Sequence, residues 1–447
     1  MDQQLSAAAD LIVRLKTKEA TIGVIGLGYV GLPICIAAGE AGLRTLGFDT
    51  DPAKPEAINQ GLSYFKHIPS QRIGPLVEKG SLAATTDFTR LSEPDALLIC
   101  VPTPLTPHLE PDLSFVISTG KTIARYLRRG QLVILESTTY PGTTTEVLRP
   151  VLETSGLKCD RDFFLAFSPE REDPGNLEYS TSRIPRVVGA DCEDAQDAAA
   201  ALYSHFVTRI VKVSSSATAE AVKLTENVFR AVNIALVNEL KVIYEAMGID
   251  VWEVIEAAKT KPFGFMPFYP GPGLGGHCIP IDPFYLTWKA REYGISTRFI
   301  ELAGQINSSM PQHVVDKLAL AIDASQGKGL NGARILILGV AYKKNVDDTR
   351  ESPALRLIEI LEARGAEVGY YDPYVPVIPH TREHKSLSGR RSQDWRPDKF
   401  NTYDAVLIVT DHDDVDYLEV AKNAKLVVDT RNACRRAGVA SPHIVQA

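Results

Sequence analysis

Short apolar runs alternate with helix-like stretches over the first part of the chain. The first run is followed by a glycine-rich turn and by a segment of helical character that ends near residue 41. Apolar runs of this length, separated by helical segments, are typical of a parallel sheet that is covered on both faces, so we predict a doubly wound α/β domain. The predicted strands are Thr21–Ile25, Arg44–Phe48, Ala96–Val101, Leu132–Glu136 and Phe163–Phe167.

The pattern changes near Ser214, where one long helical segment begins and continues to about Met247. Apolar residues occur on nearly every face of this segment, which is typical of a core helix or of a helix in an oligomer interface. We predict that it joins two domains and contributes to a homodimer or a higher homo-oligomer. The side that we expect to be buried carries Val222, Leu224, Val228, Val232, Leu236 and Leu240.

A second α/β pattern follows a loop rich in glycine and proline (residues 262–283) and further helix. Its turn at Gly339–Ala341 lacks a glycine triplet, so we do not expect this half to bind a second dinucleotide. The predicted elements are the helix Pro353–Ala363 and the strands Arg334–Val340, Glu367–Tyr371, Ala405–Val409 and Leu426–Asp429.

The predicted fold class is therefore α/β, with two doubly wound Rossmann-like domains joined by a long central helix and a helical middle domain. The 447 residues exceed one ordinary domain. We place an N-terminal α/β domain at residues 1–212, a central helical domain at 213–325 and a C-terminal α/β domain at 326–447. Ligands of such sheets bind beyond the carboxyl ends of the strands.

Charge and composition exclude several classes of function. A net charge of −7 argues against nucleic acid or an anionic membrane as the main partner. The chain has no run of about twenty apolar residues and no secretion signal at its start, so we expect a cytoplasmic protein. The six cysteines form no CxxC pair, and the histidines lack metal-ligand spacing, so we expect reduced thiols and no metal.

A dinucleotide fingerprint occupies the turn after the first predicted strand. Gly26 would make the turn, Gly28 would admit the pyrophosphate, and Gly31 would allow the helix to pack on the sheet. Asp49 ends the next strand, where a carboxylate binds the ribose hydroxyls and repels the extra phosphate of NADP. The pattern predicts NAD as the cofactor. The alternative is a glycine-rich turn without a ligand.

Two later strand ends are candidates for the rest of the cofactor groove. Pro102 and Thr103 follow one strand, and Ser137 and Thr138 follow another. Their hydroxyls and turns would line the groove, although ordinary strand-to-loop chemistry explains each pair equally well when it is taken alone.

Cys278 is the candidate nucleophile. It lies in the sequence Gly-Leu-Gly-Gly-His-Cys-Ile-Pro-Ile-Asp, where glycines let the backbone approach a ligand and a thiolate offers a strong nucleophile. A redox cofactor together with a nucleophilic thiol indicates oxidation of an alcohol or aldehyde to the acid through a covalent adduct. The alternatives are a buried apolar cysteine, a packing role for His277 and a capping role for Asp282.

Three further polar residues are candidates for the chemistry. Lys223 and Asn227 lie four residues apart on the long helix and hence on one face, where they could hold an oxyanion or a catalytic water. Glu170 follows a predicted strand and could act as a general base. The alternatives are a surface Lys–Asn pair and a surface carboxylate.

These motifs occur in the order found in one enzyme family. With the fingerprint, Ser-Pro-Glu-Arg, Lys-Leu-Thr-Glu-Asn, Gly-Gly-His-Cys and Ala-Tyr-Lys-Lys-Asn-Val-Asp-Asp-Thr-Arg-Glu-Ser, the chain resembles the UDP-glucose/GDP-mannose dehydrogenase family over essentially its whole length. The segment 261–283 is most similar to the bacterial members that oxidise UDP-N-acetylglucosamine for O-antigen or capsule precursors.

The resemblance implies a four-electron oxidation of the sugar C6 alcohol with NAD. In it Cys278 forms the thiohemiacetal and thioester, Lys223 and Asn227 stabilise the oxyanion, Asp282 supports proton movement and Glu170 assists thioester hydrolysis. Arg350 would approach the cofactor. The implied contacts to the UDP-sugar come from Glu170, Arg171, Lys223, Asn227, Tyr269, Gly276, Lys343 and Arg431.

Departures from the UDP-glucose members bear on the substrate. Those members commonly carry serine at the position of His277, a basic residue at Ile281 and a second glutamate at Pro174. The differences favour a UDP-N-acetylhexosamine. UDP-N-acetylglucosamine is the expected substrate from the resemblance of segment 261–283, with UDP-N-acetylmannosamine as the main rival, followed by UDP-N-acetylgalactosamine and UDP-glucose. Two other classes are hydroxyacid dehydrogenases, which need no cysteine and no second α/β domain, and a sensor of nucleotide sugars without turnover.

Overall fold

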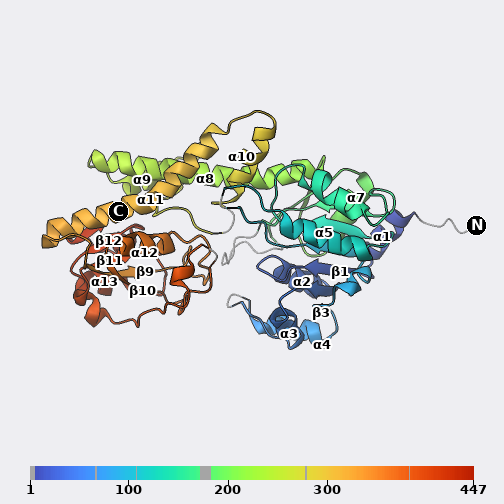
Figure 1. Cartoon of the computed structure of the whole chain (residues 1–447), viewed down its shortest axis with the longest axis horizontal. Coiled ribbons are helices and arrows are strands. Elements are labelled where there is room, and N and C mark those ends of the chain that lie inside the picture. The colour runs from blue at the N-terminus through green and yellow to red at the C-terminus, as the bar shows by residue number, and fades with distance from the viewer. Residues whose placement is uncertain (1–5, 66–67, 107, 172–182, 277–278, 382) are drawn as a thin grey trace, which may run out of the picture. The chain divides into compact units, whose positions relative to one another are not determined.

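The computed structural model describes residues 6–65, 68–106, 108–171, 183–276, 279–381 and 383–447. Contacts within the chain divide it into two compact units. The first comprises Met1–Glu226 and Phe284–Ile295, and the second comprises Asn227–Pro283 and Ser296–Ala447. Figure 1 draws both units.

The first unit is built on an eight-stranded sheet in the order β3-β2-β1-β4-β5-β6-β7-β8. The predicted doubly wound fold is confirmed, and each of the five predicted strands is present with an end shifted by two residues at most. The order of the strands reverses between β1 and β4, which is where ligands of such sheets bind. The strands are β1 Thr21–Ile25, β2 Arg44–Phe48, β3 Leu82–Thr85, β4 Ala96–Ile99, β5 Leu132–Leu135, β6 Phe164–Phe167, β7 Arg186–Ala190 and β8 Ile210–Val213.

The expectation of an entirely parallel sheet is wrong at one position. Strand β7 runs antiparallel to β6, with Ala166 opposite Ala190, and β8 then runs parallel to β7. Because β7 is reversed, its first residue, Arg186, lies at the edge where β5 and β6 end. The apolar pattern of a strand carries no information on its direction, so the sequence alone did not reveal this.

Successive residues of a strand point to opposite faces of the sheet. Both faces carry apolar side chains, and helices cover both. Val24, Leu98 and Ile134 belong to one apolar core, and Ile25 and Leu135 belong to the other. The first core is covered by α1 Ala7–Lys16, α2 Gly31–Glu40, α3 Ala53–Asn59, α4 Gly74–Glu78 and α7 Glu193–Tyr203. The second is covered by α5 Ser114–Tyr126 and α6 Arg149–Glu153. Short turns are η1 Ser70–Arg72, η2 Phe88–Ser92 and the π-helical turn η3 Thr143–Leu148.

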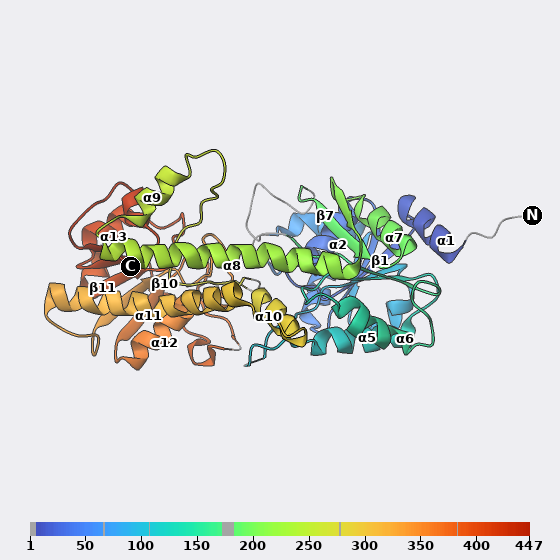
Figure 2. The ribbon, with the colours of Figure 1, turned by 90° about the horizontal axis from the view of Figure 1, so that it is seen from above.

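The long helix predicted from the apolar pattern is α8, Ser216–Ala246, and Figure 2 shows it as one continuous rod. Its buried side differs from the predicted one. Leu236 is 49% exposed, whereas Ala231 and Asn238 are buried. The side chain of Asn307 in α11 hydrogen-bonds both the Asn238 side chain and the Ala231 carbonyl. The face of α8 that carries Ala231 and Asn238 therefore packs against α11. The other helices of this region are α9 Val251–Ala258, α10 Asp282–Glu292 and α11 Arg298–Gln326.

The second unit contains a five-stranded sheet in the order β10-β9-β11-β12-β13, in which every pair is parallel. This confirms the second predicted doubly wound domain. Its strands are β9 Arg334–Leu338, β10 Glu367–Tyr371, β11 Ala405–Ile408, β12 Val427–Asp429 and β13 Ile444–Gln446. One face is covered by α11 and α12 Pro353–Ala363, and the other by α13 Tyr417–Asn423 and α14 Ala433–Arg436. Short turns are η4 Lys385–Leu387 and η5 Pro397–Thr402.

Replacing Lys241 by methionine is expected to stabilise the protein. This lysine of α8 is only 4% exposed, and none of the described residues hydrogen-bonds its Nζ. Burial lowers the pKa of Lys241 to about 8 from 10.5. Below pH 8 the ammonium is buried at full cost, so Lys241→Met should raise the free energy of unfolding by a value on the order of 3 kcal/mol.

The pH dependence distinguishes this explanation from better packing alone. Between pH 8 and 10.5 the native protein has released the Lys241 proton and the unfolded chain has not, so the stability of the wild type rises with pH. The gain from Lys241→Met should therefore shrink over that range in denaturant titrations. The exposed Lys121 of α5 offers the control, because Lys121→Met should change stability by less than about 0.5 kcal/mol. A gain that is constant from pH 6 to 10 would contradict the account.

Candidate active site

The glycine turn between β1 and α2 has two positions that packing restricts to glycine and one that remains open. Gly26 has φ +93°, and a Cβ there would lie 2.6 Å from the Cys100 carbonyl oxygen. A Cβ on Gly31 would lie 1.9 Å from the Gly26 oxygen, whereas a Cβ on Gly28 would meet nothing within 4 Å. The space at Gly28 fits the close approach of a pyrophosphate, as predicted for the dinucleotide fingerprint.

Asp49 follows β2 and accepts hydrogen bonds at both carboxylate oxygens. Oδ2 accepts from the Leu27 N–H at 2.8 Å and from Lys54 Nζ at 2.9 Å, and Oδ1 accepts from the Asp51 N–H at 3.0 Å. Burial raises the pKa of Asp49, but these hydrogen bonds outweigh it and the net shift is downward. The carboxylate is therefore ionised and fixed beside the glycine turn, which suits the predicted binding of ribose hydroxyls.

Asp49→Ala is expected to raise the KM for NAD about tenfold, which corresponds to the loss of about one charged hydrogen bond. The preference for NAD over NADP should also weaken, because the removed carboxylate no longer repels the extra phosphate. Steady-state kinetics with both cofactors measure the two effects. Asp51→Ala is the matched control, since this exposed carboxylate of the same loop accepts from the Ala53 N–H and not from the turn. An unchanged cofactor preference in Asp49→Ala would remove Asp49 from the ribose role.

Hydroxyl groups join the loops that follow β4 and β5. Ser137 Oγ donates to the Val101 carbonyl at 2.7 Å, and Thr103 Oγ1 donates to the Thr138 carbonyl at 2.8 Å. Tyr285 of α10 donates its hydroxyl proton to the Thr103 carbonyl. The hydroxyl protons of Ser137 and Thr103 thus hold the two loops together. Pro102 is exposed at the same edge.

Glu170 lies in a charged cluster at the carboxyl ends of β5 and β6. Its side chain is 13% exposed and accepts from Arg186 Nη1 at 2.8 Å and from the Arg171 N–H at 2.6 Å. Arg186 also pairs with the buried Glu136, which accepts a further hydrogen bond from Tyr203. Neither Arg186 nor Tyr203 was predicted from the sequence. The one available signal was a charged residue at the start of an apolar strand.

Arg171 is held by two groups of the first unit. Its guanidinium forms an ion pair with Glu226 of α8 at 2.5 Å and donates to the Pro185 carbonyl at 2.7 Å. Lys223, another predicted site residue, is buried on the same helix.

Asn227 and Asp282, two predicted catalytic residues, are brought together in the second unit. Asn227 Nδ2 donates to Asp282 Oδ2 at 2.5 Å, and both side chains are buried. Asp282 is the first residue of α10, so the helix start fixes its backbone. Lys223 lies one helical turn before Asn227 on α8 and therefore on the same face of that helix. Cys278 and His277 lie outside the described residues.

The glycines before Cys278 pack on the Ala341–Arg350 segment of the same unit. The Gly276 N–H donates to the Arg350 carbonyl at 3.0 Å. A Cβ on Gly276 would lie 2.9 Å from the Tyr342 ring, and one on Gly275 would lie 2.8 Å from the Tyr342 Cβ. Two motifs that are separated by some 65 residues in the sequence thus form one surface.

A buried amide pair holds the loop that leads to these glycines. Asn238 Oδ1 accepts from the Gly271 N–H at 3.0 Å, and Asn238 Nδ2 donates to Asn307 Oδ1 at 2.9 Å. A Cβ on Gly271 would lie 2.5 Å from Arg431 Nη1, so the loop passes close to that guanidinium. Arg431 in turn donates Nε to the Val409 carbonyl at 2.9 Å.

The remaining predicted residues have defined surroundings. Arg350 forms an ion pair with Asp348 at 2.6 Å and stays half-exposed, and Lys343 is half-buried in the same segment. Tyr269 donates to Glu256 at 2.7 Å and stacks on Trp252 with the ring centroids 5.7 Å apart. The contacts of these residues to a substrate stay predictions.

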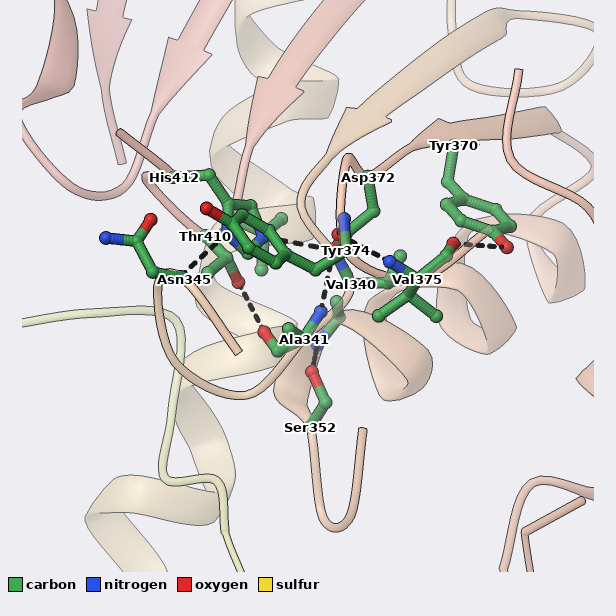
Figure 3. A network of polar contacts seen from close by, with 12 residues as sticks. Val340, Ala341, Asn345, Ser352, Tyr370, Asp372, Tyr374, Val375, Thr410 and His412 are labelled. Atoms are coloured by element: carbon green, nitrogen blue, oxygen red, sulfur yellow. Dashed lines mark hydrogen bonds and ion pairs between the residues drawn. The ribbon is translucent and has the colours of Figure 1, made fainter. Parts of the chain in front are cut away.

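The second sheet, like the first, has a glycine turn and a carboxylate at the carboxyl ends of its strands, but the carboxylate has different hydrogen-bond partners. Gly339 has φ +84° and lies 33 positions before Asp372. Its N–H donates to the Tyr371 carbonyl, in the same way as the Gly26 N–H donates to the Phe48 carbonyl. Asp372 accepts from the backbone N–H groups of Val340 and Ala341, as Figure 3 shows. This carboxylate was not predicted from the sequence.

His412 completes the Asp372 cluster. Its Nδ1 accepts from the Asn345 N–H at 3.0 Å, and its Nε2 lies 3.1 Å from Asp372 Oδ2 (Figure 3). A backbone N–H only donates, so the proton of the neutral ring is on Nε2 and is donated to Asp372. Tyr374 stacks on the imidazole with the ring centroids 5.0 Å apart.

Within the part of the chain that the structure describes, neither a cluster of metal ligands nor a membrane-spanning helix is present. In those ranges no three histidine, cysteine, aspartate or glutamate side chains gather in an arrangement that could hold a metal ion. Among the helices of the same ranges, none combines the length and the apolar character that crossing a membrane requires.

Three segments of the chain match the UDP-glucose/GDP-mannose dehydrogenase family. Residues 20–207 match its NAD binding domain, 217–309 its central domain and 336–436 its UDP binding domain.

Individual relatives are similar over most of their length. UDP-N-acetyl-D-glucosamine 6-dehydrogenase of Pseudomonas aeruginosa is 37% identical over 80% of this chain and 84% of its own. UDP-N-acetyl-D-mannosamine dehydrogenase of Pyrococcus horikoshii is 36% identical over 92% of this chain and 95% of its own. The solved structure of UDP-D-ManNAc dehydrogenase from Pyrococcus horikoshii superposes with a TM-score of 0.85 at 35% identity, covering 95% of this chain and 98% of that one.

Proposed function

This chain belongs to the UDP-glucose/GDP-mannose dehydrogenase family and is an NAD-dependent UDP-sugar dehydrogenase, and we propose that its substrate is UDP-N-acetyl-D-glucosamine. The product would be the corresponding uronic acid, a precursor for surface polysaccharide. The observation that carries the reaction type is the buried Asn227–Asp282 pair, because it joins two predicted catalytic groups at the start of the helix that follows Cys278.

NAD is the cofactor, and the glycine turn with Asp49 fits its pyrophosphate and ribose. When bound, it takes up a hydride in each of the two oxidations that convert an alcohol to an acid. In the proposed site Gly26, Gly28 and Gly31 hold the cofactor, with Asp49 ionised beside them.

The proposed covalent chemistry uses the Cys278 thiol. Its sulfur adds to the C6 aldehyde that the first oxidation leaves, and the carbonyl oxygen takes a proton to give a thiohemiacetal. Loss of a hydride and of the hydroxyl proton gives a thioester. Water then adds to the thioester carbonyl, the C–S bond breaks, and the thiolate recovers a proton while the uronic acid leaves.

The remaining groups are assigned by charge and position. We assign Lys223 and Asn227 to stabilising the oxyanion, because an ammonium and an amide N–H are donors suited to developing negative charge. One Asn227 Nδ2 hydrogen is used by Asp282, which leaves the other for the substrate. Asp282 is assigned to proton movement and Glu170 to the attack of water.

The UDP group is proposed to bind to the second unit, whose residues 336–436 match a UDP binding domain. Lys343, Arg431, Gly276 and Tyr269 are the proposed contacts there, and Arg171 is the proposed contact from the first unit. A guanidinium suits a diphosphate because its N–H groups match two phosphate oxygens. We also retain the proposals of a homodimer and of a cytoplasmic site of action.

The mannosamine epimer is the second candidate substrate. The 36% identity to the Pyrococcus horikoshii UDP-N-acetyl-D-mannosamine dehydrogenase favours it almost as strongly as the 37% identity favours glucosamine. The two sugars differ only in the configuration at C2.

A substrate panel separates the candidates. Purified protein with NAD should form NADH with UDP-N-acetylglucosamine at a kcat/KM at least about tenfold above the values for UDP-N-acetylmannosamine and UDP-glucose, since one well-placed polar contact contributes about that factor. A higher kcat/KM with the mannosamine epimer would overturn the substrate proposal and leave the NAD-dependent oxidation in place.

A further inference from the structure

Arg186 is a buried arginine that links two carboxylates at the cofactor edge of the first sheet. It is 3% exposed. Its Nη2 donates to Glu136, its Nη1 donates to Glu170 Oε2 at 2.8 Å, and its Nε donates to Ser168 Oγ at 2.8 Å. All three nitrogens of the guanidinium therefore have an oxygen partner.

The guanidinium has little freedom to move. Glu136 is itself buried and accepts a second hydrogen bond, from the Tyr203 hydroxyl. The Tyr203 ring lies 4.7 Å from the guanidinium carbon, and the Ser168 hydroxyl donates its proton to the Val187 carbonyl at 2.8 Å. Residues at the ends of β5, β6 and β7 thus form one rigid cluster.

The antiparallel strand β7 explains why the cluster lies at this edge. Ser168 and Glu170 follow β6, Glu136 follows β5, and Arg186 begins β7. In a parallel strand the first residue would lie at the opposite end of the sheet. The reversal brings a cation to the edge at which substrates bind, where it faces the partly exposed Glu170.

The cluster holds both oxygens of the Glu170 carboxylate. Oε2 accepts from Arg186 and Oε1 accepts from the Arg171 N–H. A carboxylate that takes a proton from an attacking water must present one lone pair to that water, so its orientation limits the rate. The orientation of Glu170 depends on Arg186, whose own position depends on Glu136 and Ser168.

We propose that Arg186 is a positioning residue for thioester hydrolysis, which holds Glu170 in the orientation that activates the attacking water. This rests on the proposed function, in which Glu170 assists that step. Water adds to the thioester carbonyl as its proton passes to Glu170. The C–S bond then breaks, and the proton goes from Glu170 to the leaving sulfur. Arg186 takes no part in either oxidation.

The test is Arg186→Lys in the full-length protein, because lysine keeps the charge but cannot reach three partners at once. Both oxidations should proceed once, so rapid mixing should give a burst of up to about two NADH per active site. Steady-state turnover should then fall about 10- to 100-fold, the cost of misplacing one catalytic group. Intact-protein mass spectrometry should show the accumulated acyl adduct. Glu170→Gln should give the same signature, and the double variant should add little to it.

Arg128→Lys is the matched control. Arg128 pairs with the buried Asp95 at 2.5 Å, at the opposite end of the same sheet. It should lower thermal stability without producing a burst or an adduct. If Arg186→Lys also slows turnover without a burst or an adduct, the role of Arg186 is structural and the proposal is overturned.

Two further measurements keep the test decisive. If Arg186→Lys fails to fold, Ser168→Ala takes its place, because it removes only the hydroxyl that Arg186 Nε contacts. Ser168→Ala should give the same burst and adduct, with turnover about three- to tenfold lower. The absence of the burst and the adduct would overturn the proposal. The wild type is measured first. Failure to form two NADH per sugar there would refute the proposed function itself, whereas a normal wild type with unaffected Arg186 and Ser168 variants refutes only the positioning role.

Discussion

Cys278→Ser is expected to lower formation of the uronic acid by at least about a thousandfold, the scale of removing a nucleophile. A serine hydroxyl is hardly ionised at neutral pH, so neither the hemiacetal adduct nor a readily hydrolysed acyl group would form at a useful rate. NAD binding should persist, because Gly26, Gly28, Gly31 and Asp49 are unchanged. Product analysis by mass spectrometry and calorimetry of NAD binding give the two readouts.

Cys192→Ser is the control for this result. Cys192 caps α7, where its sulfur accepts from the Ala195 N–H at 3.4 Å, and serine is a better capping residue. Its activity should remain at the wild-type level. Acid formation at the wild-type rate in Cys278→Ser would refute the thiol mechanism.

Asp372→Ala is expected to destabilise the protein by about 3–5 kcal/mol, which is typical of breaking a buried charged cluster. The carboxylate accepts from four backbone N–H groups and from His412, and alanine would remove the acceptor of all five hydrogen bonds. The cluster is drawn in Figure 3. Denaturant unfolding at pH 7 measures the loss.

The acid limb of the stability curve gives a second check on Asp372. Burial raises the pKa of Asp372, but hydrogen bonds from His412 and from the backbone outweigh it, so the net shift is downward from 3.8. A lowered folded-state pKa stabilises the native state above pH 3.8 and ceases to do so as the pH falls through the folded value. The stabilisation of wild type relative to Asp372→Asn that comes from this shift should therefore diminish as the pH falls below 4.

Asp398→Ala is the matched control for Asp372→Ala. Asp398 belongs to the same unit and forms an exposed ion pair with Arg396 at 2.9 Å. Its replacement should cost less than about 0.5 kcal/mol. An equal loss of stability in the two variants would contradict the importance assigned to burial.

The features of the fold that the sequence predicted are those that short segments determine. The strands Thr21–Ile25 and Glu367–Tyr371 were predicted at their observed bounds, because an apolar run between turn residues reports its own ends. Gly26 and Asp49 could be assigned to one site from the sequence, because one strand–helix–strand unit sets the spacing between them.

What the sequence did not predict depends on contacts between distant segments. Arg186 meets Glu170 and Glu136 across 16 and 50 positions, and only the reversal of β7 brings them together. His412 meets Asp372 across 40 positions. Leu236 was wrongly placed on the buried side of α8, because the amide pair of Asn238 and Asn307 packs on a different face of that helix.

The two sheets place a glycine turn and a carboxylate at the same edge and use them differently. Asp49 lies beside the open position at Gly28 and accepts from one side chain, that of Lys54. Asp372 accepts from four backbone N–H groups and lies against the buried His412. The first arrangement leaves room for a ligand at the turn. The second stabilises the turn itself, and that this half binds no second dinucleotide stays a prediction.

The central claim is a four-electron oxidation of one UDP-sugar at a single cysteine. The most direct test is the number of NADH molecules formed per uronic acid, with NADH followed by absorbance and the acid quantified by chromatography, using UDP-N-acetylglucosamine as the limiting reagent. The account predicts two NADH per acid with no free aldehyde. One NADH per sugar, with an aldehyde or ketone as the product, would contradict it.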